Sequence, residues 1–82
     1  MVIKTPYVSE KASMMLESDG KLQFIVRHTA NKTQIARAVT EMFAHDVTSV
    51  TTVMTMKGQK KAIVTFADKK AGEEILSRLG IL

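Results

Sequence analysis

The sequence contains no cysteine and no tryptophan, and its aromatic residues are one tyrosine and three phenylalanines. The lack of cysteine excludes disulfides and thiolate metal sites and is typical of a cytoplasmic protein. RNA-binding domains often stack bases on aromatic side chains, so any RNA binding here is expected to rely on shape and phosphate contacts. No apolar run approaches the roughly 20 residues of a membrane span, and we expect no membrane insertion.

The chain is short, at 82 residues, which predicts one domain over residues 1–82. Its hydrophobic content of 45% and charged content of 24% are typical of a globular protein. Twelve Lys and Arg against eight Asp and Glu give a net charge of +4. This charge fits an RNA or another acidic partner, although many basic proteins do not bind nucleic acid.

Hydrophobic periodicity predicts a strand, a helix and a second strand over residues 2–3, 9–17 and 21–28. Ser9 is expected to cap the helix. The second strand alternates between apolar and polar residues, so one of its faces is expected to be well buried. That face consists of Leu22, Phe24 and Val26.

Residues 31–44 give the clearest helical pattern. Asn31 is a good N-cap, and Gln34 three residues later completes a sequence typical of a capping box. Apolar residues recur at the spacing of one helical face, which predicts a helix packed on a core. They are Ile35, Ala38, Val39, Met42 and Phe43.

A hairpin is predicted from two strands over residues 47–56 and 62–66. Gly58-Gln59 favours a two-residue type II′ turn, which would place three lysines on one exposed tip. The same turn pairs Met56 with Lys61, Thr55 with Ala62 and Val53 with Val64. It puts Val53, Ala62, Val64 and Phe66 on one face, and Val50, Met54, Met56 and Ile63 on the other.

A last helix is predicted over residues 69–79, capped by Asp68 and ended by Gly80, with Ile81 contacting Leu76 as in a Schellman motif. Its apolar stripe is Ala71, Ile75 and Leu79, with Leu76 beside it. The element order is strand-helix-strand-helix-strand-strand-helix. This order predicts an α+β fold with a mostly antiparallel four-stranded sheet, and it disfavours a doubly wound parallel sheet.

The residues show no constellation for catalysis or for a cofactor. His28 and His45 lie on different elements without a third ligand, which disfavours a metal site. No glycine-rich phosphate loop is present. A small hydrolase of the acylphosphatase type would need an arginine-bearing loop near the first strand, and residues 4–6 supply neither arginine nor glycine. The five internal methionines, at positions 14, 15, 42, 54 and 56, are expected to fill the core, with the last two as possible exceptions.

Basic residues at turns and helix starts are the candidates for phosphate contact. Lys57, Lys60 and Lys61 at the hairpin are the strongest, because each phosphate they neutralise releases counterions. The alternative is that they only discourage edge-to-edge pairing. The second group opens the main helix, where free amides attract phosphate, although a simple cap also explains it. It comprises Asn31, Lys32, Thr33 and Arg37. Further candidates are Lys4, Thr5 and Arg27.

Five strings occur along the chain in a fixed order: PYVSEKA from Pro6, ANKTQIARAV from Ala30 with Phe43 after it, VTSVTT from Val47, KGQKKAIVTF from Lys57, and EEILSRLGIL at the end. Together they resemble the large-subunit ribosomal protein of family 23, in its short archaeal-type form. The resemblance covers essentially the whole chain. It implies a non-enzymatic, ribosome-bound cytoplasmic protein that binds large-subunit rRNA beside neighbouring ribosomal proteins.

The resemblance also implies a position near the exit of the nascent-peptide tunnel and docking of nascent-chain factors such as signal recognition particle. Glu10 lies where the family's docking acid is found, and Ser9 is assigned to the same docking site. Lys11 beside them is assigned to RNA. The family's usual Val-Asn-Thr is Val50-Thr51-Thr52 here, so Thr51 and Thr52 are assigned to RNA, with a hydroxyl in place of an amide. The alternative function is a free-standing RNA-binding or regulatory domain, which would purify as a homo-oligomer.

Overall fold

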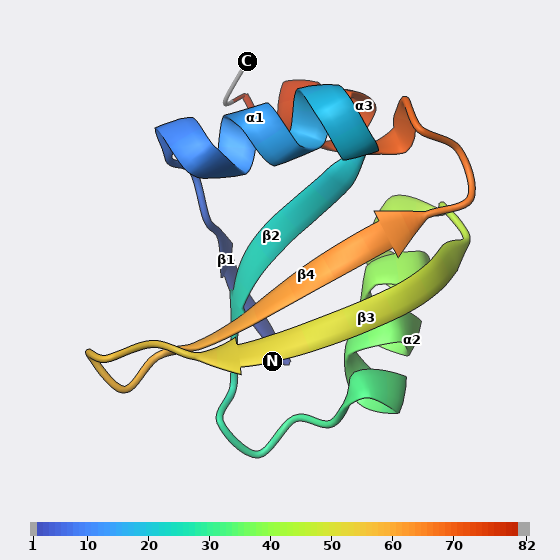
Figure 1. The fold of residues 1–82 in the computed structure, drawn as a ribbon. Helices are drawn as coiled ribbons and strands as arrows, with labels where there is room; N and C mark the ends of the chain where they lie inside the picture. Colours follow the sequence, from blue (N-terminus) through green and yellow to red (C-terminus); the bar gives the residue numbers. More distant parts are fainter. Residues whose placement is uncertain (1, 81–82) are drawn as a thin grey trace.

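The computed structural model describes residues 2–80 and contains four strands and three helices (Figure 1). In chain order they are β1 (Ile3–Pro6), α1 (Glu10–Asp19), β2 (Lys21–Val26), α2 (Lys32–Phe43), β3 (Val47–Met54), β4 (Lys60–Phe66) and α3 (Ala71–Arg78). Every strand pair is antiparallel, and the strand order is β1-β2-β4-β3. The predicted element order and α+β class are confirmed, with strand ends displaced by a few residues.

The first two helices begin at the predicted caps. The Ser9 hydroxyl accepts a backbone N–H of the first turn of α1, at 3.1 Å. The helix continues to Asp19, because the left-handed residue that ends it is Gly20 (φ 66°). At α2, the Asn31 side chain accepts the N–H of Gln34 at 2.8 Å, and the Gln34 side chain accepts the N–H of Asn31 at 3.0 Å. The predicted capping box is confirmed.

The predicted start of the last helix is wrong. The Asp68 carboxylate accepts the N–H of Lys70 at 2.9 Å. This bond spans two residues and forms an Asx turn, so it closes a turn in front of the helix and does not cap it. α3 therefore begins at Ala71 and has no side-chain cap.

The end of α3 is only partly as predicted. Gly80 has φ +77°, as expected for a glycine just past a helix end. Ile75 and Leu76 are buried, but Leu79 is 42% exposed and does not belong to the apolar stripe. The predicted contact of Ile81 lies outside the described residues.

The predicted hairpin turn is wrong. The N–H of Gly58 donates to the carbonyl of Thr55 at 3.0 Å, and Gly58 adopts φ +82°. The N–H of Thr55 in turn donates to the carbonyl of Gln59 at 2.8 Å. Residues 56–58 therefore form a three-residue loop, in which the glycine takes the left-handed last position and not the first position of a type II′ turn.

The loop also shifts the register of the hairpin. Val53 pairs with Lys61, where the sequence predicted Val64, a slip of three positions. Because an odd slip exchanges the two faces of a strand, the predicted faces of β3 are wrong. Val50 packs against the core, whereas Val53 lies on the other face and is 44% exposed.

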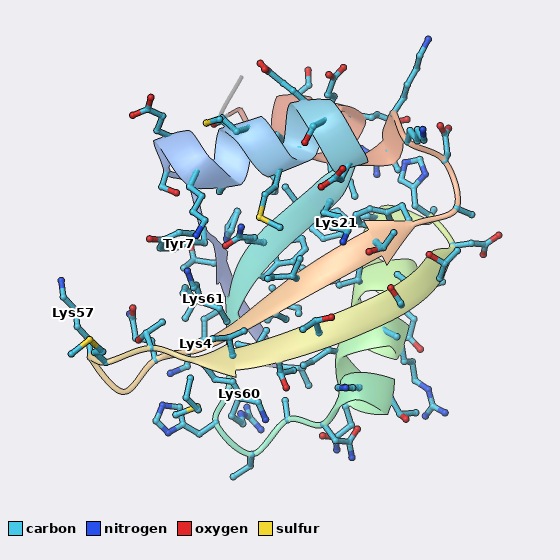
Figure 2. The ribbon with its side chains drawn as sticks, viewed as in Figure 1. Lys4, Tyr7, Lys21, Lys57, Lys60 and Lys61 are labelled. Carbon is cyan, nitrogen blue, oxygen red and sulfur yellow. The ribbon has the colours of Figure 1, made fainter. Side chains whose placement is uncertain are left out.

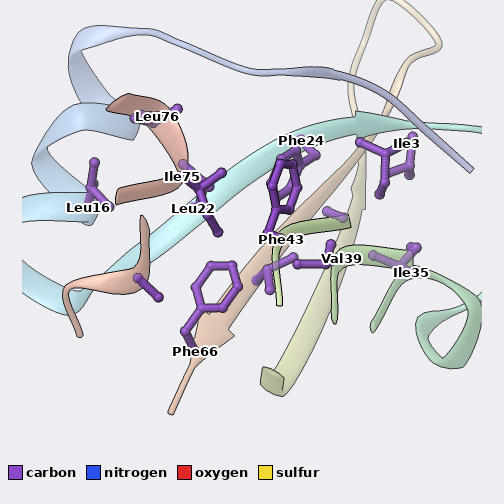
Figure 3. Close-up of a cluster of buried hydrophobic side chains, with 14 of the residues drawn as sticks. Ile3, Leu16, Leu22, Phe24, Ile35, Val39, Phe43, Phe66, Ile75 and Leu76 are labelled. Atoms are coloured by element: carbon purple, nitrogen blue, oxygen red, sulfur yellow. The ribbon is translucent and has the colours of Figure 1, made fainter. Parts of the chain in front are cut away.

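One cluster of buried side chains fills the space between the sheet and the helices (Figure 3). α2 lies across one face of the sheet, and α1 and α3 lie together beside the start of β2 (Figure 1). The rings of Phe24 and Phe43 stack with their centroids 5.9 Å apart. The cluster also contains Ile3, Leu16, Leu22, Val26, Ile35, Val39, Ala62, Val64, Phe66, Ile75 and Leu76.

The expectation that methionines fill the core is wrong for Met14, Met15 and Met42, whereas Met54 and Met56 are exposed, as the sequence allowed. Aromatic and branched side chains occupy the core, and all five internal methionines lie outside it. Met15 is half-buried, and Met56 is fully exposed in the hairpin turn. The exposed fractions of the other three, Met14, Met42 and Met54, are 61%, 46% and 55%.

Among residues 2–80, no helix lies across the second face of the sheet, yet β2 is buried there too. Gln23 and Ile25 point to this face and are only 4% and 7% exposed. Tyr7 and Met15 lie beside Gln23 and cover part of the strand. The prediction of one well-buried face is therefore incomplete. We call this second surface, formed by the cross-strand rows described below, the open face.

Candidate nucleic-acid interface

The open face consists of three rows of side chains that run across β3, β4 and β2. The register gives these rows as Ser49–Thr65–Lys21, Thr51–Ile63–Gln23 and Val53–Lys61–Ile25. None of the four strands that the structure describes contains an Asp or a Glu. They contain four lysines: Lys4, Lys21, Lys60 and Lys61. The sheet is therefore cationic, and the acidic residues lie on helices and turns.

The three hairpin lysines do not share a tip (Figure 2). Lys57 lies exposed in the turn, whereas Lys60 and Lys61 belong to β4 and point to opposite faces. The ammonium of Lys60 donates to the carbonyl of Ala30 at 2.7 Å and lies 3.4 Å from that of His28. The predicted three-lysine tip is wrong, because Lys60 is engaged in a contact with the loop before α2.

Lys61 is held on the open face by Tyr7. Its ammonium lies 4.2 Å from the centroid of the Tyr7 ring, within the range of a cation–π contact. Tyr7 is fixed beyond the end of β1, because its N–H donates to the carbonyl of Gln23 at 2.9 Å. No functional role was predicted for Tyr7 or Gln23. The alternation of β2 was the available signal, since it places Gln23 on the face of Ile25.

A hollow of about 340 Å³ lies on the open face beside the N-terminal half of α1. Its lining includes Tyr7, Lys11, Met15, Gln23, Lys61 and Ile63. The amide nitrogen of Gln23 donates to the sulfur of Met15 at 3.1 Å. We call this feature the Tyr7–Lys61 hollow. It brings Lys11 and Lys61, which were predicted separately, to one site.

The two threonines assigned to RNA lie on opposite faces of β3. Thr51 pairs with Ile63 and is exposed on the open face. Thr52 pairs with Ala62, which is fully buried, and is itself half-buried on the side of the helices. Only Thr51 therefore contributes to the cationic surface.

Lys4, Thr5 and Arg27 lie at the β1 edge of the sheet, and all three are exposed. Thr5 pairs with Ile25, which is also the partner of Lys61, so β1 continues the same row of the open face. Arg27 directly follows β2, and its N–H donates to the carbonyl of Val2 at 2.9 Å. The structure thus places Thr5 in the same row as Lys61, with Ile25 of β2 between them.

The start of α2 forms a separate surface. Asn31, Thr33 and Arg37 line a hollow of about 270 Å³, together with Glu41. Lys32 lines a different hollow, between α2 and β3. The Asn31 side chain already caps the helix, and the Glu41 carboxylate is unfavourable for a phosphate in the first hollow. This surface is weaker as an anion site than the sequence suggested.

At the start of α1, the predicted docking and RNA residues are divided. The Ser9 hydroxyl is used as the helix cap, and the residue is half-buried. Glu10 is exposed in the first turn of α1, while Lys11 lines the Tyr7–Lys61 hollow. Of the two docking residues, only Glu10 offers a free charged group.

No cluster of metal-ligating side chains is found among residues 2–80. In the same part of the chain, none of the helices is both long and apolar enough to cross a bilayer.

Residues 1–74 match the family described as ribosomal protein L23. The chain belongs to this family. Membership identifies it as a non-enzymatic ribosomal protein and confirms the expected ribosome-bound, cytoplasmic location and the resemblance seen in the sequence.

Proteins named large ribosomal subunit protein uL23 match almost the entire chain. That of Methanospirillum hungatei is 56% identical over 82 residues and covers 100% of both chains. That of Methanococcoides burtonii is 49% identical over 80 residues, covering 98% of this chain and 96% of its own. That of Methanococcus maripaludis S2 is 40% identical over 80 residues, covering 98% and 93%. The near-complete coverage in both directions confirms the short form of the family.

Proposed function

We propose that this protein is a structural constituent of the large ribosomal subunit and binds large-subunit rRNA as a single domain, mainly through the open face and the β1 edge. The chemistry is electrostatic and shape-based, with no bond made or broken. The exposed lysines and hydroxyls of this surface contact phosphates and riboses. Neighbouring ribosomal proteins would cover the remaining surfaces.

The observation that carries this proposal is the separation of charge between the sheet and the rest of the chain. The described strands contain four lysines and no acid, although the whole chain has eight Asp and Glu. Of these lysines, Lys21 and Lys61 lie in the rows of the open face, whereas Lys60 points to the other face. A surface of one sign attracts a polyanion and raises the rate of its association. The open face has no helix lying across it, so it leaves room for a large partner.

The salt dependence of rRNA binding tests this interface. Binding of the full chain to transcribed large-subunit rRNA is measured between low and moderate salt, for the native protein and for Lys61→Gln. Because each phosphate contact releases counterions, the slope of log K against log salt should fall by roughly 0.7–0.9 when Lys61 is changed. Lys69→Gln, on the exposed turn before α3, is the matched control and should leave the slope unchanged. Equal slopes for all three proteins would contradict the proposed face.

We further propose that the protein lies near the tunnel exit and that Glu10 helps to dock nascent-chain factors such as signal recognition particle. Glu10 is exposed in the first turn of α1. An acid on an otherwise basic protein favours a partner with a basic patch. The family resemblance of the PYVSEKA segment supports this role, and the short hairpin limits any reach into the tunnel.

Recruitment of signal recognition particle to ribosomes that contain Glu10→Lys tests the docking role. We expect weaker recruitment with normal incorporation of the protein into large subunits. Glu73→Lys makes the same charge change at an exposed position of α3 and should recruit normally. Equal recruitment by both variants and the native protein would remove Glu10 from the docking site. A stable homo-oligomer that never co-sediments with large subunits would instead favour the free-standing alternative.

A further inference from the structure

We propose that the Tyr7–Lys61 hollow receives one unpaired nucleobase of the bound rRNA. The inference rests on the proposed rRNA binding and adds a base-contacting site to it. The sequence predicted contacts to shape and phosphate because aromatic residues are scarce. The three phenylalanines are all buried, and the tyrosine alone lies at the open face, in the wall of a hollow.

Gln23 is the first reason to expect a base. Gln23 is only 4% exposed, yet it lines the hollow. Its amide nitrogen contacts the sulfur of Met15, which is a weak acceptor. A side-chain amide offers both a donor and an acceptor, and this pair matches the hydrogen-bonding edge of a base. A stronger partner than sulfur would satisfy Gln23 better.

The lining of the hollow is the second reason. Val53, Ile63 and Met15 supply apolar surface for the flat face of a base. Tyr7 adds an aromatic ring, and base–aromatic contacts tolerate any base identity. The volume of about 340 Å³ lies at the small end of the range for ligand pockets, roughly 300–1,000 Å³. A nucleobase with its ribose is a partner of this size class.

The charges around the hollow are the third reason. Lys11 and Lys61 both line it, and no acidic residue among the described ones does so. A nucleotide brings a phosphate with its base, so both lysines gain a counterion. An apolar side chain from a neighbouring protein would fill the hollow but would leave the Gln23 amide nitrogen with the Met15 sulfur, a weak acceptor, in place of a stronger hydrogen-bond partner. Charge and hydrogen bonding therefore favour RNA over protein.

Chemical footprinting of transcribed large-subunit rRNA, with base-specific and ribose-specific reagents, tests the inference on the full-length chain. Val53→Trp places a large side chain at the hollow, and Gln23→Leu removes the amide while keeping similar bulk. Met54→Trp is the matched control, because it adds the same group at the next residue, which is also exposed but lies on the other face. We expect the native protein and Met54→Trp to protect one unpaired base. That base should regain the reactivity of free RNA with either hollow variant, and affinity should fall about tenfold.

The outcomes separate the hollow from the interface. One outcome is that the native protein shows the ribose footprint and the salt slope, but the Gln23 and Val53 variants change the reactivity of no base. The hollow then does not receive a base, while rRNA binding by the open face stands. If the native protein shows no rRNA footprint, the proposed function fails as well. A photo-crosslinking amino acid at position 53 of protein assembled into large subunits gives a second measurement that does not depend on affinity. A crosslink to an rRNA nucleotide supports the inference, and a crosslink to a protein or to nothing overturns it.

Discussion

The ammonium of Lys60 lies 2.7 Å from the carbonyl oxygen of Ala30, thirty residues earlier in the chain. This bond ties the start of β4 to the loop that leads into α2. Lys60→Met keeps the apolar stem and removes the donor, so we expect the free energy of unfolding to fall by about 1–2 kcal/mol, with an unchanged rRNA salt slope. Lys57→Met, in the exposed turn, should not change stability. Urea unfolding and rRNA titration measure the two effects, and a reduced slope with unchanged stability would show that Lys60 contacts phosphate.

Two substitutions of Asn31 separate capping from RNA binding. Asn31→Ala removes the side chain that accepts the N–H of Gln34, and should cost about 1 kcal/mol of stability. Asn31→Asp retains an equally good cap and adds a negative charge. If a phosphate lies at the start of α2, Asn31→Asp should weaken rRNA binding without loss of stability. If Asn31→Asp binds rRNA as tightly as the native protein, Asn31 caps the helix and does not contact RNA.

Gly72 allows α1 and α3 to approach closely. A Cβ added at Gly72 would overlap the side chain of Leu16, which is buried in the core. Gly72→Ala should therefore destabilise the protein by about 1–3 kcal/mol, even though alanine is the better helix former by about 1 kcal/mol. Ser77→Ala, at an exposed position of the same helix, is the control. Thermal unfolding compares them, and a Gly72→Ala variant more stable than the native protein would show that Leu16 moves aside freely.

β3 is an outer strand of the sheet, and its sequence contains no charged residue and no proline. Such edges pair readily with other strands. Without rRNA, we expect the protein to self-associate at high concentration, and Ser49→Lys should reduce this association. Ser77→Lys adds the same charge on α3 and should have a smaller effect. Light scattering measures the association, and equal suppression by both variants would indicate an effect of net charge alone.

The sequence predicted the parts of the fold that depend on neighbouring residues. Ser9 and Asn31 cap their helices because each accepts an N–H from within the next turn. The hairpin register could not be predicted in this way. Gly58 fits a type II′ turn and a three-residue loop equally well. In the three-residue loop that the structure has, the register places Val50 against the core.

The site was predicted less well, because its contacts are distant in sequence. The lysines were identified by their charge, but charge does not say whether Lys60 meets a carbonyl or solvent. The contact between Tyr7 and Lys61 joins the end of β1, the first strand in the sequence, to β4, the last one. Likewise, the contact of Gln23 with Met15 depends on how α1 packs beside β2, which the spacing of residues along the chain does not predict.

The position of Tyr7 gives this protein a built-in optical probe. The chain has no tryptophan and a single tyrosine, so its intrinsic fluorescence comes from one ring, and that ring touches Lys61 at the open face. Ultraviolet emission therefore reports on this one surface without any label. Binding of RNA to this surface can therefore be followed with the isolated native chain, from the emission of Tyr7 alone.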